Sequence, residues 1–367
     1  MSRLKLIRTA TIPTSLNIFC RGMLHELSQN YEVIAVSSCG KELDQIAERE
    51  GVRTIGVNME RRVAPLKDLI SLIRLTRVFK NEKPDIVHSM TPKAGLLSMV
   101  AAWMAGVPIR IHTFTGLVFP TATGLKKQIL MLTDKITCAC ATHVIPEGEG
   151  VKNDLINYRI TNKPMRVLGF GNVRGVDMTH YMPQPVAHED FRFLFIGRIV
   201  RDKGINELVQ AFIQLPENAQ LWLVGDVEKS DPVNEQTMQT IHQHPRIKLF
   251  DSTDDVRPYY NQADCLVLPS YREGFPNVVL EAGAMQLPCI VTDINGSREI
   301  ISPHKNGLMV PSRNTDELFR AMLYMLEHTQ QAQTMGRNAR PVIAEKFEQS
   351  FVRNCLYNYY KEITHAL

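Results

Sequence analysis

The chain has 367 residues, more than one hydrophobic core usually organises, so two domains are expected. With 44% hydrophobic and 22% charged residues it reads as a globular protein, and its longest apolar stretches, such as residues 96–107, fall short of the roughly 20 residues of a membrane span. The cysteines lack the spacing of a zinc site, and their odd number, seven, argues against a disulfide framework. The first residues lack the apolar core of a secretory signal. A cytoplasmic location is therefore expected.

The net charge of +4 is shared unevenly along the chain. Residues 1–183 hold 24 Lys and Arg against 15 Asp and Glu, whereas the remainder holds 18 against 23. A basic first half suits an anionic partner, such as a phosphate-bearing lipid or a membrane surface, but it is also compatible with a solvated surface that binds nothing. The cations in question include Arg61, Arg62, Lys126, Lys127, Arg159 and Lys163.

Short β-branched apolar runs alternate with helical patterns from end to end. In the first half, strands are predicted at 4–10, 32–37, 53–57, 85–89, 108–114, 142–145 and 165–168, with helices that include 66–81, 93–105 and 126–140. The helical stretch 125–132 is amphipathic, which is compatible with contact to a membrane surface, but an apolar side that faces the core is the expected arrangement. This alternation predicts βα units that build a buried parallel sheet.

The alternation of predicted strands and helices is interrupted at residues 169–190, where glycine and proline cluster as in a linker. It resumes after these residues. Strands are predicted at 192–196, 220–224, 247–250, 264–268, 289–292 and 308–310, with helices up to 214, near 235–242 and from about 277. The predicted fold is α/β, with two doubly wound Rossmann-like domains that face each other across a cleft. We place the first domain at residues 1–183 and the second at residues 184–348.

Several familiar motifs are absent. The run from Gly169 to Gly175 imitates a dinucleotide fingerprint, but its spacing and its place in the linker are wrong. There is no GxxxxGK[ST] loop, no HExxH and no GxSxG. No Asp-x-Asp pair is present to clamp a manganese ion, so neither a metal nor another cofactor is expected.

Two segments of the second half combine charges suited to a nucleotide sugar. In the segment GRIVRDKG, Arg198 and Lys203 follow a predicted strand end, where a diphosphate needs its charge neutralised. In the segment EGFPNVVLE, Glu273 and Glu281 flank the start of a predicted helix. The backbone amides from Gly274 to Val278 would attract an anion, and the two carboxylates would accept hydrogen bonds from sugar and ribose hydroxyls.

These segments, followed by DINGSRE at 293–299 and GLMVP at 307–311, resemble the retaining GT-B glycosyltransferases of family four. The segments IHTFTGLVF (111–119) and GFGNVRGVD (169–177) are similar to the subgroup that builds bacterial surface polysaccharides and glycan-lipid precursors. The resemblance implies that the second domain binds the donor, that the first binds the acceptor, and that a C-terminal helix at 349–367 packs back on the first.

The resemblance also implies roles for individual residues. Arg198 and Lys203 would bind the donor phosphates, and Glu281 would bind the ribose. Glu273, with backbone at Gly274, Phe275, Pro276, Asn277 and Val278, would hold the donor sugar. The base would lie near Gly225, Phe250 and Asp251.

The first half departs from the family pattern at two places. Many relatives have a histidine directly before the glycine that follows a central strand, whereas here Thr115 precedes Gly116 and the nearest histidine is His112. Either His112 or Thr115 would face the transferred sugar. The first βα loop lacks the usual glycine pair, but Thr14 and Ser15 offer hydroxyls to a phosphate or an acceptor.

The predicted reaction is transfer of a hexose or N-acetylhexosamine-type sugar from a nucleotide sugar, with uridine as the subgroup's usual base. The anomeric configuration would be retained and no metal would be used. The acceptor would be a glycan linked to a lipid diphosphate, reached by peripheral binding at the inner face of the cell membrane. No nucleic acid is expected as a partner. Two alternatives stay open, a UDP-sugar epimerase of the same fold and a binding module without catalysis.

Overall fold

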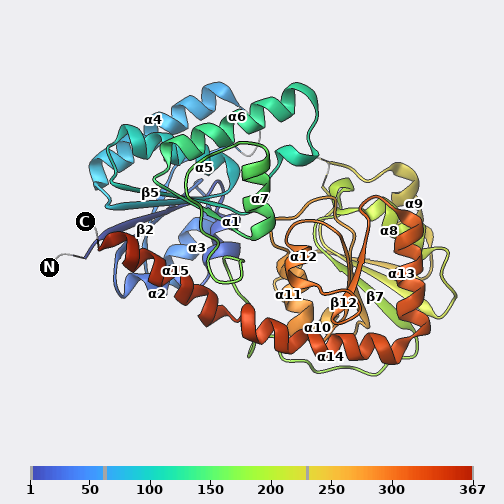
Figure 1. Ribbon diagram of the computed structural model, residues 1–367. Coiled ribbons are helices and arrows are strands. Elements are labelled where there is room, and N and C mark those ends of the chain that lie inside the picture. The colour runs from blue at the N-terminus through green and yellow to red at the C-terminus, as the bar shows by residue number, and fades with distance from the viewer. Residues whose placement is uncertain (1–2, 61–63, 229–230, 366–367) are drawn as a thin grey trace. The chain divides into compact units, whose positions relative to one another are not determined.

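The computed structural model describes residues 3–60, 64–228 and 231–365. These residues divide into two compact units (Figure 1). Unit 1 comprises Met1–Arg174 and Val352–Leu367, and unit 2 comprises Gly175–Phe351. The boundary lies at Gly175 and not after residue 183, because the backbone of Val176 exchanges hydrogen bonds with Phe347 and Gln349 of unit 2.

Unit 1 is built on six parallel strands in the order β3-β2-β1-β4-β5-β6. The strands are β1 (Lys5–Thr9), β2 (Glu32–Ser37), β3 (Arg53–Gly56), β4 (Ile86–Met90), β5 (Ile109–Phe114) and β6 (His143–Pro146). Strands β1, β4 and β5 are buried along almost their whole length, as expected for a parallel sheet that helices cover on both faces.

Helices cover both faces of this sheet (Figure 1). One apolar core lies under α4 (Pro65–Glu82), α5 (Pro92–Met104), α6 (Gly124–Cys140) and α7 (Glu149–Asn157), and it includes Leu75 and Phe79. The second core includes Leu16, Leu43 and Tyr360. It lies under α1 (Pro13–Cys20), α2 (Met23–Ser28), α3 (Lys41–Glu50) and α15 (Gln349–Thr364), whose residues from Val352 onward belong to unit 1.

Unit 2 repeats this architecture with six parallel strands in the order β12-β11-β10-β7-β8-β9. They are β7 (Phe191–Ile196), β8 (Ala219–Val224), β9 (Ile247–Phe250), β10 (Cys265–Leu268), β11 (Cys289–Thr292) and β12 (Gly307–Val310). One continuous apolar core extends through the unit, with Phe193, Phe195 and Phe212 fully buried. The prediction of two doubly wound α/β domains is thus confirmed.

The helices of unit 2 form two groups (Figure 1). Helix α8 (Ile205–Phe212) packs beside α9 (Glu235–Gln243) and α13 (Thr315–Glu327), whereas α11 (Asn277–Ala284) packs beside α12 (Ser297–Ile300) and α14 (Thr329–Lys346). The short helix α10 (Arg257–Tyr260) precedes β10. Asparagine side chains fix two of the helix starts: Asn234 and Asn314 accept hydrogen bonds from amides of the first turns of α9 and α13.

One prediction for the first half was wrong, and a second was met only in part. Residues 165–168 are not a strand, because only a single bridge joins Met165 to Val144 of the outermost strand, β6. In α6, Leu125 and Leu132 point away from the core, and 72% and 56% of their surfaces are exposed. The side that faces the core carries the half-buried Leu130 and Met131, together with the buried Asp134, Thr137 and Cys138.

The buried Asp134 leads to a prediction about pH. Burial raises the pKa of this carboxyl to about 7, from its ordinary value of 3.8. The folded protein therefore holds a proton on Asp134 that the unfolded chain releases above pH 4, and stability is lost as the pH rises from about 4 to about 7. Because asparagine imitates the neutral acid, Asp134→Asn should stabilise unit 1 at pH 8 by about 3 kcal/mol more than at pH 4.5.

The measurement is urea unfolding of Asp134→Asn and its parent at both pH values. Trp103, the single tryptophan of unit 1, reports the transition in a Trp222→Phe background. An equal effect of the substitution at the two pH values would contradict a protonated Asp134.

Candidate functional site

The second unit gathers its predicted site residues at one edge of its sheet. Parallel strands end at the same edge, and the loops that follow β7, β8, β9 and β10 carry Arg198, Gly225, Asp251 and Glu273, respectively. Strands β7 and β10 are neighbours, and the chain leaves them in opposite directions along the sheet. They therefore form the topological switch point, where open α/β sheets bind their ligands.

The loops after β7 and β10 are tied together at this switch point. The Lys203 ammonium lies 2.5 Å from a carboxylate oxygen of Glu273, and both side chains are mostly buried. Beside them, Arg272 Nε donates to Asp202 at 3.2 Å, and the Tyr271 amide donates to the Asp202 carbonyl at 2.8 Å. The structure thus pairs a predicted phosphate-binding cation with a predicted sugar-binding carboxylate, which fixes where each can act.

Arg198 is held less tightly than Lys203. Its guanidinium forms an ion pair with Glu228 at 2.9 Å, and 46% of its side chain is exposed. An exposed pair of this kind contributes little to stability, so a ligand phosphate can compete for the guanidinium at small cost. Arg198 is positioned at the strand end and stays accessible.

Close backbone approaches account for three of the glycines around this edge. A Cβ on Gly225 would lie 2.0 Å from the Gly197 carbonyl oxygen, and one on Gly204 would lie 2.1 Å from the Pro269 carbonyl oxygen. A Cβ on Gly296, in the loop after β11, would lie 2.3 Å from the Gly274 carbonyl oxygen. Glycine at these positions lets the loops of neighbouring strands converge on one small region.

Glu281 lies inside α11, one turn after its start, and only 5% of its surface is exposed. The Tyr260 hydroxyl donates to its Oε2 at 3.1 Å and also contacts the Val278 carbonyl. Burial, followed by the charge of Glu281, raises the pKa of Tyr260 well above its ordinary value, so the hydroxyl stays protonated and remains a donor. Tyr260 therefore orients the carboxylate.

The structure shows which groups at the start of α11 a ligand can reach. The Phe275 ring is buried and packs against Phe347 at 5.3 Å between centroids, so only the Phe275 backbone can meet a ligand. Pro276 has no N–H to donate, and its carbonyl accepts from the amides of Val279 and Leu280. The half-buried Asn277 and Val278 begin the helix at the same edge as Glu273.

The predicted base region also lies at this edge. The Gly225 amide donates to the Phe250 carbonyl at 2.9 Å, which joins the ends of β8 and β9. Ser252 donates from both its amide and its hydroxyl to Asp226, and these bonds join the loop after β9 to the loop after β8. The Phe250 ring packs among Trp222 and Tyr259, whereas Asp251 is exposed.

In unit 1, the structure places His112 inside the sheet and not at its edge. The ring is buried, its Nδ1 lies 2.9 Å from the Ser89 hydroxyl, and a Cβ on Gly95 of α5 would fall 2.3 Å from it. Burial lowers the pKa of His112 to about 3, so the ring is neutral. The suggestion that His112 faces a sugar is therefore wrong for this conformation, because strand and helix enclose the ring.

Thr115 and Gly116 follow the end of β5 and are half-buried at the carboxyl edge, which leaves Thr115 as the candidate of the two. Thr14 and Ser15 belong to the first turn of α1. The Thr14 hydroxyl is exposed and donates to Glu42 at 2.8 Å, and the Ser15 amide donates to the Ile12 carbonyl.

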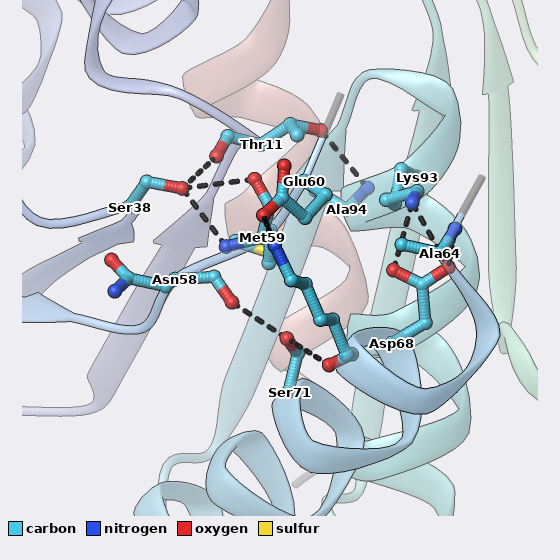
Figure 2. A network of polar contacts seen from close by, with 11 residues as sticks. Thr11, Ser38, Asn58, Met59, Glu60, Ala64, Asp68, Ser71, Lys93 and Ala94 are labelled. Atoms are coloured by element: carbon cyan, nitrogen blue, oxygen red, sulfur yellow. Dashed lines mark hydrogen bonds and ion pairs between the residues drawn. The ribbon is translucent and has the colours of Figure 1, made fainter. Parts of the chain in front are cut away.

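The carboxyl edge of unit 1 also carries a polar network that the sequence did not reveal (Figure 2). The Thr11 hydroxyl accepts from the Ala94 amide in the first turn of α5, and Ser38 donates to the Thr11 carbonyl. The Lys93 ammonium contacts both oxygens of Asp68, at 2.7 and 2.9 Å. This network fixes the loops after β1, β2 and β4. Arg61 and Arg62 lie outside the described residues.

A small cavity of about 20 Å³, room for about one water molecule, lies within unit 1. Arg8, His88, Thr113 and Glu147 are among the residues that line it. The Arg8 guanidinium is fully buried and contacts His88 and the Tyr360 hydroxyl, each at 2.6 Å. No residue proposed from the sequence lines this cavity, which is too small for a sugar.

Neither unit offers a metal centre in the part of the chain that is described, where no three His, Cys, Asp or Glu side chains gather as ligands. Likewise, none of the described helices is at once long and apolar enough to cross a membrane.

Comparisons with known proteins agree with this geometry. Residues 190–328 match the family described as "Glycosyl transferases group 1", and residues 16–171 match "Glycosyl transferase 4-like domain". The capsular polysaccharide biosynthesis glycosyltransferase CapM of Staphylococcus aureus is 31% identical over 96% of this chain and 95% of its own length. This chain belongs to the group 1 glycosyltransferases.

Other relatives of this glycosyltransferase extend the comparison. The UDP-Gal:alpha-D-GlcNAc-diphosphoundecaprenol alpha-1,3-galactosyltransferase of Escherichia coli is 27% identical over 78% of each chain. Among solved structures, Anabaena Alr3699/HepE in complex with UDP and glucose superposes with a TM-score of 0.83 at 16% identity, covering 98% of this chain and 100% of that one. The predicted GT-B fold is thereby confirmed.

The glycosyltransferase site includes residues that sequence reasoning missed. Tyr260 orients Glu281, Glu228 holds Arg198, and Asp202 joins the loops after β7 and β10. For Asp202 a signal was available, since it lies between Arg198 and Lys203 in the motif itself. No sequence signal pointed to Tyr260, because the tyrosine and the glutamate come from different helices.

Proposed function

We propose that this glycosyltransferase moves a hexose or N-acetylhexosamine-type sugar from a UDP-sugar to a lipid-diphosphate-linked glycan during bacterial surface-polysaccharide synthesis. The transfer retains the anomeric configuration and needs no metal ion. The observation that carries the proposal is the pairing of Lys203 with Glu273 at the switch point of unit 2, flanked by Arg198 and Glu281.

Lys203 and Arg198 suit the negative charge that develops when the bond between the donor sugar and its diphosphate breaks. As the bond between the anomeric carbon and the diphosphate oxygen opens, negative charge grows on the leaving phosphate. Lys203 is already fixed by its contact with Glu273, so little reorganisation is required at that moment. Arg198 supplies a second cation, and the start of α11 supplies backbone amides.

The state of the two glutamates supports retention without a carboxylate nucleophile. Glu273 is bound to Lys203, and Glu281 is buried and receives the Tyr260 hydroxyl. In the proposed step the acceptor oxygen bonds to the anomeric carbon on the face that the phosphate leaves. The proton of the acceptor hydroxyl passes to the departing phosphate oxygen, so no protein base is required.

The named activities of the relatives support the acceptor and the pathway class. CapM is described as a capsular polysaccharide enzyme, and the Escherichia coli relative acts on a sugar linked to diphosphoundecaprenol. A Campylobacter jejuni relative, 24% identical, is named for transfer to a diphospho-undecaprenol-linked sugar. An acceptor of this kind would place the enzyme peripherally at the inner face of the cell membrane.

The deciding experiment is a binding and turnover screen of the purified protein against UDP-, GDP- and ADP-sugars in the presence of EDTA. Turnover is measured with and without a prenyl-diphosphate-linked N-acetylhexosamine, and the linkage of the product is assigned by NMR. A UDP-sugar transferred to the acceptor with the donor's anomeric configuration would support the proposal. Isomerised donor in the absence of acceptor would indicate an epimerase, and an inverted linkage would overturn retention.

A second prediction concerns the orientation of Glu281. Glu281→Gln removes a charged hydrogen-bond acceptor from the proposed ribose contact and should raise the donor Kd by about 10- to 100-fold. Tyr260→Phe removes only the orienting hydroxyl, so we expect a rise in KM of about fivefold with little change in kcat. Titration calorimetry and steady-state kinetics measure these effects, with Glu217→Gln, at an exposed glutamate of unit 2, as the control.

A further inference from the structure

Unit 1 has a topological switch point of its own. From β1 the chain adds β2 and β3 on one side of the sheet, and from β4 it adds β5 and β6 on the other side. The carboxyl ends of β1 and β4 are therefore the counterpart of those of β7 and β10 in unit 2. Open α/β sheets bind their ligands at this position. The donor site uses the switch point of unit 2, which leaves that of unit 1 for the second substrate, the acceptor.

A lysine held by a carboxylate lies at this switch point, as it does in unit 2 (Figure 2). Lys93 follows β4 in the first turn of α5, and its ammonium lies 2.7 and 2.9 Å from the two carboxylate oxygens of Asp68 in α4. The exposed fractions of these side chains are 15% and 20%, close to the 20% and 14% of Lys203 and Glu273. Both units thus present a partly accessible ammonium that a carboxylate holds in place.

The position of Asp68 does not depend on Lys93 alone. The Ala64 amide donates to Oδ2 of Asp68 at 3.2 Å, which anchors the carboxylate at the start of its own helix. The ammonium of Lys93 has three N–H donors on a flexible stem, so it can turn toward an incoming phosphate. A diphosphate carries more negative charge than one carboxylate and can therefore compete for this ammonium.

Two threonine hydroxyls join the ends of β1 and β4 and provide a further donor. Oγ1 of Thr11 and Oγ1 of Thr91 lie 2.8 Å apart. The Thr11 hydroxyl also accepts from the Ala94 amide, and the Thr91 hydroxyl accepts from the Thr11 amide. One hydroxyl proton closes the contact between the two threonines, and within the part of the chain that the structure describes the other proton has no acceptor. An oxygen of a ligand would accept it.

These groups favour an oxyanion as the ligand and not a neutral sugar. An ammonium and a spare hydroxyl proton are both donors, and a phosphate oxygen is the acceptor that suits them. The Ala94 amide is already bound to Thr11, so side chains and not the amides of α5 would carry the recognition. Thr91 has φ of 68°, a strained conformation for a β-branched residue, and strain of this kind is concentrated at functional sites.

We propose that the switch point of unit 1 binds the diphosphate of the lipid-linked acceptor, with Lys93 as the residue that recognises its charge. The Lys93 ammonium contacts the diphosphate oxygens, and the pair formed by Thr11 and Thr91 donates one hydrogen bond to them. This inference rests on the proposed function, because it names the part of the acceptor that unit 1 recognises. It requires contact with the phosphates themselves, not with a membrane surface.

The test compares two water-soluble acceptors of the full chain, without membrane. One is a short-chain prenyl-diphosphate-linked N-acetylhexosamine, and the other is the alkyl glycoside of the same sugar, which has no phosphate. The parent should prefer the diphosphate acceptor in kcat/KM. Lys93→Gln should lower this preference by about 10- to 100-fold, the value of a charge-assisted hydrogen bond, and should leave the donor Kd unchanged.

A purely structural role of Lys93, as a tie between α4 and α5, predicts other results. Loss of the tie would slow transfer to both acceptors equally, and Asp68→Asn would do the same harm as Lys93→Gln. We expect instead that Asp68→Asn does not lower the preference, because it removes the competitor for the ammonium and keeps an oxygen for the Ala64 amide. Equal slowing with both acceptors in Lys93→Gln would overturn the proposal.

The matched control is Lys67→Gln, at a second lysine that pairs with a carboxylate at the same edge. Lys67 contacts Glu60 at 2.6 Å, but 68% of its side chain is exposed. The control should keep the preference of the parent, and an equal loss there would show that only the overall charge matters and would overturn the site at Lys93.

Folding of the variants is checked by urea unfolding, followed through Trp103 of α5 in the Trp222→Phe background. If Lys93→Gln does not fold, the double variant with Asp68→Asn, which leaves no unpaired carboxylate, replaces it and should lose the preference to the same extent. A double variant that keeps the preference would contradict the proposal.

Calorimetric titration of the diphosphate acceptor in the absence of donor separates this proposal from the proposed function. Acceptor binding that depends on Lys93, without any sugar transfer, would overturn the proposed function alone. Transfer to the diphosphate acceptor with an unchanged preference in Lys93→Gln would overturn the site alone. A parent that uses both acceptors equally would overturn the site together with the proposed acceptor class.

Discussion

Replacing Lys203 by alanine is expected to lower kcat for sugar transfer by roughly 100- to 1,000-fold, with a smaller change in donor KM. Removal of one preorganised donor aimed at developing charge typically costs about 3–4 kcal/mol of transition-state stabilisation. Lys203 follows β7 at the switch point and is held by Glu273, so its ammonium is fixed before the donor bond breaks. Steady-state kinetics with the donor identified by the screen measures both constants.

A structural role for the same ion pair predicts a different pattern. If Lys203 only neutralised Glu273, then Glu273→Gln would restore activity to the Lys203→Ala enzyme, because no unpaired carboxylate would remain. We expect the double variant to stay as slow as Lys203→Ala or slower. Lys305→Ala removes an exposed cation of unit 2 and should leave kcat unchanged. Restored activity in the double variant would contradict a direct role of Lys203 in catalysis.

The sequence predicted the two sheets well because their strands are buried on both faces. The predicted strands at 192–196 and 32–37 have apolar centres, FLFI and VIAV, and they match β7 and β2 to within a residue at each end. The run at 165–168, MRVL, is also mostly apolar but fails as a strand. It follows Pro164, precedes Gly169, and reaches the outermost strand through one bridge only. Composition alone does not reveal whether a partner strand is available.

The donor residues were predictable because their positions relative to strand ends can be read from the chain. Arg198 and Lys203 follow one predicted strand, and Glu273 follows another, so the carboxyl edge brings them together. The partners that orient them could not be predicted. The contact between Tyr260 and Glu281 joins α10, which precedes β10 in the chain, to α11, which follows it. The geometry of this contact depends on how the two helices pack.

His112 shows the opposite failure. A histidine near a strand end suggests a ligand contact, but alternate residues of a central parallel strand are buried on both faces. His112 lies two positions before the last residue of β5, and the glycine at position 95 gives its ring room against α5. The orientation of α6 was missed for a related reason. Two stripes of that helix contain apolar residues, and the sequence does not say which of them faces the sheet.

The last prediction concerns the backbone contact that brings the loops after β7 and β8 together. Gly225→Ala should destabilise unit 2 by roughly 3–6 kcal/mol, because the added methyl meets the Gly197 carbonyl oxygen at 2.0 Å in a backbone conformation that favours glycine. Urea unfolding followed by the fluorescence of Trp222, in the strand that ends at Val224, reports this loss. Donor binding should weaken as well, since the loop that carries Arg198 must shift.

Gly197→Ala is the matched control, because it separates the conformational cost from the collision. Gly197 has φ of 149° and Gly225 has φ of 145°, but a Cβ on Gly197 meets only the Phe195 ring at 3.4 Å, an ordinary contact. The control should therefore cost only the conformational part, about 1–3 kcal/mol. If the two variants lose equal stability, the close approach of the loops is not what makes glycine necessary at position 225. If Gly225→Ala alone also loses the donor, convergence of these loops is what positions Arg198 for the phosphates.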